Sequence, residues 1–78
     1  MDSDYFQNIK VQPNPTTDKV IVESNENIKS ISVMTLNGVL ILENQKQKEV
    51  SLVGLPSGMY FLDIVTDNAR KTIKVVKE

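Results

Sequence analysis

Apolar side chains recur at every second position of this chain, in short runs separated by polar or glycine- and proline-containing segments. A period of two is typical of a strand with one buried face, because successive side chains point to opposite faces of a sheet. Isoleucine and valine together number 17 against a single alanine, and β-branched side chains favour strands over helices. The sequence therefore predicts an all-β domain without a substantial helix.

About seven such runs occur, at a spacing of about 8–12 residues that is typical of an antiparallel sandwich. The predicted strands are Asn8–Gln12, Lys19–Ser24, Ile28–Leu36, Val39–Glu43, Glu49–Val53, Met59–Thr66 and Arg70–Lys77. Two packed sheets bury a shared aliphatic layer, whereas an open sheet leaves one apolar face in water. We therefore expect one immunoglobulin-like β-sandwich over residues 8–78, and residues 1–7 as a linker remnant or residues added for expression.

The alternation also assigns the faces of the longer predicted strands. The side chains expected to share a buried face are Ile31, Val33, Tyr60, Leu62, Ile64, Ile73 and Val75. The opposite face of the sixth strand, which we expect to be partly exposed, carries Met59, Phe61, Asp63 and Val65.

Turn chemistry separates these strands. Pro13-Asn14-Pro15 ends the first strand, because proline donates no backbone hydrogen bond and restricts the residue before it. Asn37-Gly38 between two apolar runs predicts a β-hairpin with a type I′ turn, in which both central residues have positive φ. The run Val39–Leu42 is apolar at every position, which indicates cover on both faces, or dimerisation or strand exchange with a second molecule.

The chemical inventory of the chain argues against an enzyme. It has no cysteine and no histidine, so thiolate nucleophiles, imidazole bases and nearly all transition-metal sites are excluded, and we expect no cofactor. The net charge of −1 and the scarcity of aromatic residues predict no nucleic-acid binding, and we expect no small-molecule substrate. The first ten residues lack the apolar region of a signal peptide, and no apolar run approaches the ~20 residues needed to span a bilayer.

Four short motifs occur in a characteristic order along nearly the whole chain. They are Pro13-Asn14-Pro15-Thr16-Thr17-Asp18, Leu36-Asn37-Gly38, Gly54-Leu55-Pro56-Ser57-Gly58-Met59-Tyr60 and Lys71-Thr72-Ile73-Lys74-Val75-Val76-Lys77. From about Ile9 to Glu78 the chain resembles the C-terminal sorting domain (type A) of proteins exported by the type IX (Por) secretion system of Bacteroidota. One departure is Gln12, since an aromatic residue commonly stands at this position in the family.

The resemblance implies a secretion signal and not a catalyst. Such a domain is attached to the C-terminus of a cargo protein, which it directs from the periplasm through the outer-membrane translocon. A sortase-like peptidase typically then removes the domain, and the cargo is anchored at the cell surface or secreted. The implied partners are thus the translocon, the peptidase and the N-terminally attached cargo.

The family motifs point to eight candidate recognition residues: Pro13, Asn14, Pro15, Gly58, Tyr60, Lys71, Lys74 and Lys77. Several have a structural alternative. The prolines can simply end a strand, Gly58 can serve its turn, and the Tyr60 ring can lie in the core with its hydroxyl bonded at the rim.

The three lysines cannot form one flat basic stripe. By alternation Lys71 and Lys77 point with the buried face, while Lys74 points to the opposite face. Edge-strand lysines can prevent pairing between edges, or a partner can add a strand to the last strand, with the lysines setting its register.

A second function class remains open from the residues alone. A passive immunoglobulin- or fibronectin-like spacer, or a carbohydrate-binding module, has the same fold. Carbohydrate binding usually uses exposed tryptophan or tyrosine rings; the chain has no tryptophan, and we expect Tyr5 in the N-terminal tail and Tyr60 in the core.

Overall fold

The computed structural model describes residues 9–78, so the predictions for residues 1–7 and for Asn8 lie outside the described part. Seven strands follow one another: β1 (Lys10–Gln12), β2 (Lys19–Glu23), β3 (Ile28–Met34), β4 (Leu40–Gln45), β5 (Glu49–Ser51), β6 (Gly58–Thr66) and β7 (Arg70–Lys77). They form two antiparallel sheets, of order β1-β2-β5 and β4-β3-β6-β7. The predicted β-sandwich is confirmed, and no helix is present between residues 9 and 78.

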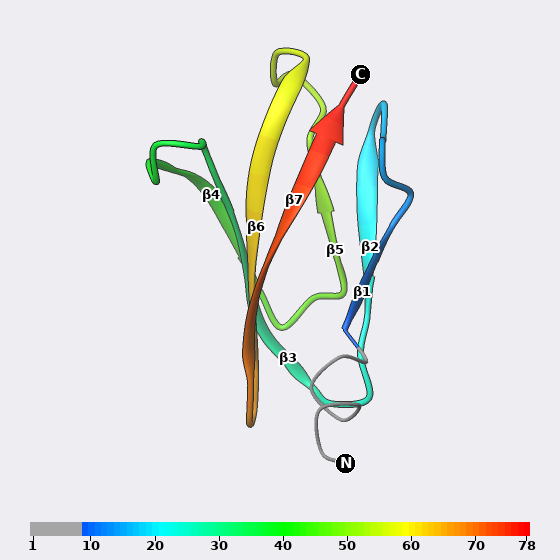
Figure 1. The fold of residues 1–78 in the computed structure, drawn as a ribbon. Coiled ribbons are helices and arrows are strands. Elements are labelled where there is room, and N and C mark those ends of the chain that lie inside the picture. Colours follow the sequence, from blue (N-terminus) through cyan, green and yellow to red (C-terminus); the bar gives the residue numbers. More distant parts are fainter. Residues whose placement is uncertain (1–8) are drawn as a thin grey trace.

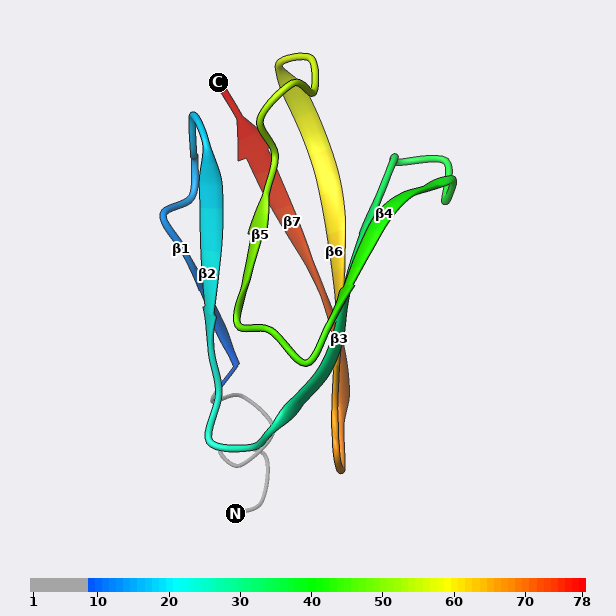
Figure 2. The ribbon, with the colours of Figure 1, turned by 180° about the vertical axis from the view of Figure 1, so that it is seen from behind.

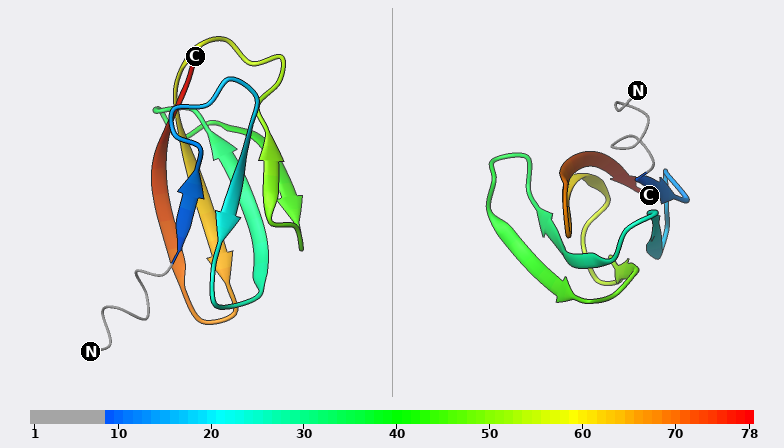
Figure 3. Two further views of the ribbon diagram at one scale, coloured as in Figure 1. Left: turned by 90° about the vertical axis from the view of Figure 1, so that its right-hand side faces the viewer. Right: turned by 90° about the horizontal axis from the view of Figure 1, so that it is seen from below.

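The two sheets lie face to face, and the chain crosses between them three times (Figures 1 and 2). The crossings follow β2, β4 and β5, so that β3 and β6 occupy the centre of the four-stranded sheet and β4 and β7 its edges. Seen along the sandwich, β4 diverges from the three-stranded sheet, whereas β7 lies beside β1 (Figure 3). The two sheets therefore meet at the β7 edge and are open at the β4 edge.

The layer between the sheets is aliphatic, as the alternation predicts. Its fully buried side chains are Val20, Val22, Ile31, Val33, Val50, Leu52, Leu62, Ile64 and Val75. Burying one such side chain contributes roughly 1.5–3 kcal/mol, which explains how a chain of this size folds around a single layer. Ile73 is only partly buried, and it packs against this core from the middle of β7.

The Asn37-Gly38 hairpin joins β3 and β4 as expected, but the predicted type I′ turn is wrong. Gly38 has φ +89°, whereas Lys46 is the only non-glycine residue with positive φ in the described chain. The Gly38 N–H donates to the Thr35 carbonyl and the Thr35 N–H to the Val39 carbonyl, both at 2.9 Å. This is a three-residue loop with glycine as its left-handed last residue, and so only one position requires positive φ.

Asp63 is a second correction, because its side chain is buried on the face that we expected to be partly exposed. The residue is 7% exposed, and Arg70 covers it from β7. Arg70 donates from Nε to Oδ1 at 3.0 Å and from Nη2 to Oδ2 at 2.7 Å. The hydrogen bonds to Asp63 and its negative charge raise the pKa of the Arg70 guanidinium. Asp63 is therefore a structural carboxylate whose charge is paired.

Glu26 connects the β2–β3 loop to the β6–β7 turn. Its carboxylate accepts hydrogen bonds from the Thr66 hydroxyl at 2.7 Å and from the Asn68 carboxamide at 3.1 Å. These bonds, first the one from Thr66, lower the pKa of Glu26 below its ordinary value of 4.5. The carboxylate form therefore stabilises the folded state.

The stability of the domain is expected to fall in acid partly through Glu26. A carboxyl group with a lowered folded-state pKa stabilises fully above its unfolded pKa, and the contribution is lost as the pH falls through the folded value. Glu26→Gln should remove this part of the pH dependence. Chemical denaturation between about pH 6 and about pH 3 measures it; equal pH dependence of the variant and the parent would contradict the prediction.

Candidate recognition site

Three of the four family motifs meet at the end of the sandwich where β7 ends (Figure 1, top). We call this group the motif cluster and define it by Asn14, Thr16, Leu55, Pro56, Gly58, Tyr60, Lys74, Val76, Lys77 and Glu78. Its members come from the β1–β2 connection, the β5–β6 loop with the start of β6, and β7. The fourth motif, Leu36-Asn37-Gly38, lies apart from the cluster at the tip of the β3–β4 hairpin (Figure 2).

The proline-containing motif is bonded to the outer edge of β7. The Asn14 carboxamide donates from Nδ2 to the Lys74 carbonyl and accepts at Oδ1 from the Val76 N–H, both at 3.0 Å. Two residues later the Thr16 N–H donates to the Val76 carbonyl at 2.9 Å, and the Glu78 N–H donates to the Thr16 carbonyl at 2.8 Å. Residues 14–16 therefore accompany the last part of β7 as a short parallel partner.

Thr16 anchors this segment, although it is not among the eight candidate recognition residues. The residue is 3% exposed; its hydroxyl donates to the Lys19 carbonyl at 2.9 Å and accepts from the Asp18 N–H at 3.2 Å. The Leu52 N–H in turn donates to the Asp18 carbonyl at 2.8 Å. A threonine directly after the second proline was the available signal, since threonine hydroxyls bond nearby backbone in turns.

The glycine-containing motif is held from both sides. The Tyr60 ring is buried as predicted, and its hydroxyl donates to the Pro56 carbonyl at 2.6 Å. The Lys77 ammonium donates to the Leu55 carbonyl at 2.8 Å. Gly58 pairs with Lys77 at the start of β6, with φ +154°, a conformation that side-chain-bearing residues rarely adopt. Tyr60 and Lys77 thus both hold the loop of Leu55 and Pro56.

The structure brings most of the eight candidate residues together, but not all of them. Pro13 and Pro15 flank Asn14 and are exposed, with cis peptide bonds before both. Lys74 lies in the cluster through its backbone, and its side chain is exposed on the outer face. Lys71 lies six residues before Lys77, paired with Ile64 and half-buried, and it makes no contribution to the cluster.

Exposed apolar side chains accompany the motif cluster. Met59 and Val76 are register partners on neighbouring strands, and they are 47% and 37% exposed. The apolar run that we expected to be covered is also open: Val39 is 61% and Leu40 54% exposed in the hairpin, while Ile41 and Leu42 are half-buried. Dimerisation or strand exchange through this run stays a prediction.

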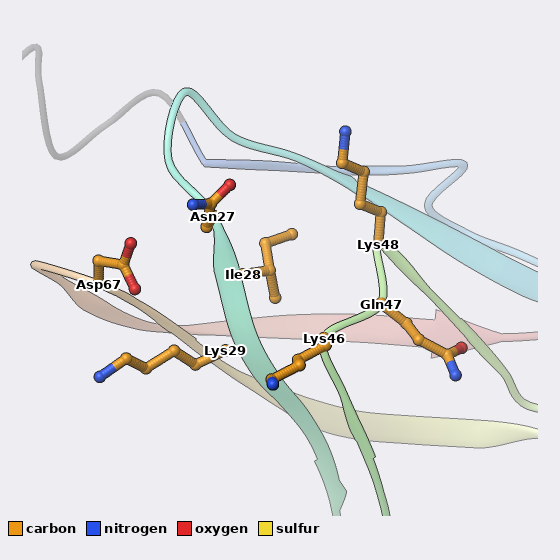
Figure 4. Close-up of a pocket in the computed structure, with 7 residues that line it drawn as sticks. All are labelled: Asn27, Ile28, Lys29, Lys46, Gln47, Lys48 and Asp67. Carbon is orange, nitrogen blue, oxygen red and sulfur yellow. The ribbon is translucent and has the colours of Figure 1, made fainter.

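The opposite end of the sandwich carries an open pocket of about 430 Å³. Asn27, Ile28, Lys29, Lys46, Gln47, Lys48 and Asp67 line it. Figure 4 shows the ammonium groups of the three lysines spread around the pocket rather than converging on one point. Between residues 9 and 78 there is also no group of three acidic side chains placed to hold a metal ion.

The described chain contains no helix with the length and apolar character needed to cross a membrane.

A family model described as the secretion system C-terminal sorting domain matches residues 10–78. The chain is also 27% identical over 84 residues to karilysin of Tannerella forsythia, a match that covers 87% of this chain and 18% of karilysin. It therefore spans less than a fifth of that relative's length. Since the family model covers nearly all of it, the chain belongs to the secretion system C-terminal sorting domains, the sorting signals of type IX secretion.

Proposed function

We propose that the motif cluster is the part of this domain that the outer-membrane translocon of the type IX system recognises. The observation that carries the proposal is the bonding of three separate family motifs to one another at one end of the sandwich. In the proposed sequence the domain accompanies its cargo through the periplasm and across the outer membrane. A sortase-like peptidase then removes the domain, and the cargo is anchored at the cell surface or released.

The direction of the chain supports this placement. The described chain begins at the end of the sandwich opposite the motif cluster, and β1 and β7 both run toward the cluster (Figure 1). Cargo attached ahead of β1 therefore leaves the cluster accessible. The exposed pair Met59 and Val76 supplies apolar area beside it, and burial of apolar area is the main favourable contribution to most protein association.

Within residues 9–78 the carbohydrate-binding alternative lacks its usual contact surface. Tyr60, which would have to form a stacking platform, is 8% exposed and its hydroxyl is bonded to Pro56. A passive spacer does not require motifs that are bonded to one another at one end of the sandwich, so we propose no second function.

Fusion of residues 1–78 to a periplasmic reporter tests the proposal in a host that has the type IX system. The reporter should reach the cell surface with the domain attached to its C-terminus and remain in the periplasm without it. The folded state of the fusion is checked by protease resistance of the domain. A folded fusion that stays in the periplasm would overturn the proposal.

Charge reversal at Lys74 should weaken export, because its side chain is exposed beside Val76 while only its backbone supports the fold. We expect Lys74→Glu to weaken recognition roughly five- to thirtyfold, as for loss of a contact worth about 1–2 kcal/mol. Lys29→Glu is the matched control, since Lys29 is an exposed strand lysine at the opposite end. Surface display of the reporter is measured for both variants; equal display would exclude Lys74 from the recognised surface.

A further inference from the structure

Residues 14–16 hydrogen-bond the outer edge of β7 in the way that an additional strand would. Backbone groups of a strand alternate between its two sides, so β7 offers Lys74 and Val76 to the side away from β6. The Asn14 carboxamide bonds the Lys74 carbonyl and the Val76 N–H, and the Thr16 backbone continues with the Val76 carbonyl and the Glu78 N–H. Four hydrogen bonds thus cover this end of the edge.

Asparagine suits this position because its carboxamide presents a donor N–H and an acceptor oxygen on the same side, as the backbone of one residue in a partner strand does. The flanking Pro13 and Pro15 have no N–H, so they give the covering segment no donors with which to pair a further strand. Within residues 9–78, only Asn14 and Thr16 hydrogen-bond the outer backbone groups of β7. The segment therefore covers the edge and presents little new edge itself.

The edge needs cover because β7 is long and the opposite edge of the same sheet complements it. β7 spans eight residues and carries four positive charges, at Arg70, Lys71, Lys74 and Lys77. The other edge strand, β4, is apolar in its first half and carries one charge, the negative Glu43. The positive charges therefore disfavour pairing between two β7 edges, whereas the negative charge of β4 favours pairing of β7 with β4 of another molecule.

We propose that Asn14 is an edge-blocking residue, which prevents β7 of one molecule from pairing with β4 of a second copy of this chain. Such a contact joins two different surfaces, so it does not close on itself and continues from copy to copy. A long unprotected strand edge is a template for this kind of association. Asn14 thereby prevents association through the β7 edge, a role that is independent of recognition by the translocon.

Removal of the carboxamide should convert the domain into an open-ended assembly. In Asn14→Ala the Lys74 carbonyl and the Val76 N–H lose their partner, and we expect self-association at least about tenfold tighter than in the parent, from one or two new backbone bonds. Sedimentation velocity over a concentration series should show species that grow beyond the dimer. Asn25→Ala, in an exposed loop away from the edge, is the matched control and should associate no more than the parent.

Two second-site variants identify the contacting edges. Thr72→Pro places a proline on the outer edge of β7, and Glu43→Lys reverses the charge on β4; each should return the self-association of Asn14→Ala to that of the parent. If Asn14→Ala does not fold, Asn14→Asp, which keeps only the acceptor for Val76, is used in its place. A monomeric variant, growth that stops at a dimer, or association unaffected by Thr72→Pro would each overturn the proposal.

Discussion

Leu62→Ala is expected to lower the free energy of unfolding by about 2–5 kcal/mol, the range for large-to-small changes in a core. Leu62 is fully buried in β6, and its register partners are Val33 on β3 and Ile73 on β7. Neighbours on both sides are fixed in the sheet, so the cavity left by the side chain does not collapse. A domain of this size has roughly 4–12 kcal/mol in total, so the variant is near the limit of folding at physiological temperature.

Denaturant titration followed by circular dichroism measures the loss. Met59→Ala is the matched control, because Met59 is an apolar residue of the same strand whose side chain is 47% exposed. We expect its effect to stay within about 0.5 kcal/mol. Equal losses in the two variants would mean that the two faces of β6 do not differ in burial as described.

Gly58→Ala is expected to destabilise the domain by about 1–3 kcal/mol through backbone conformation alone. A Cβ at this position meets no heavy atom within 4 Å, so steric overlap contributes nothing. The penalty arises because φ of +154° disfavours an L-residue, and relaxing it moves Gly58 out of register with Lys77. The loss should therefore extend to the motif cluster and reduce export of an attached reporter.

Thermal unfolding and surface display of the reporter are measured together for Gly58→Ala. Ser57→Ala, the neighbouring exposed residue with ordinary φ, is the control and should change neither quantity. A variant with parental stability would show that the chain at Gly58 is free to adopt another conformation. A stable variant that fails only in export would make Gly58 a contact residue and not a conformational one.

The strands and their buried faces were predictable because they depend on local alternation. Ile31, Val33, Leu62 and Ile64 lie in the core for the reason that their spacing indicated. Strand ends differ by one or two residues where a turn begins early, as at Thr35, whose backbone and hydroxyl both bond Val39. The turn type was missed because Asn-Gly is compatible with both a two- and a three-residue loop.

The motif cluster was only partly predictable, because its contacts join distant parts of the chain. Asn14 and its partners on β7 are separated by 60 and 62 residues, and nothing local to either segment indicates the pairing. The burial of Asp63 was missed for a different reason: Arg70, seven residues later on the neighbouring strand, covers the carboxylate, and strand alternation alone does not indicate that pairing. Family resemblance identified the motif residues, while their mutual contacts came from the three-dimensional structure.

Because residues 14–16 are bonded to residues 74–78, the motif cluster forms only when the two ends of the domain are both folded. A chain that has not yet folded from its first strand to its last has the motifs but lacks their arrangement, because no segment forms the cluster alone. Contacts of such high sequence separation form late, after the intervening loop has closed. Under the proposed recognition, a translocon that binds the cluster would therefore select domains that have finished folding, and incomplete copies would be left out of export.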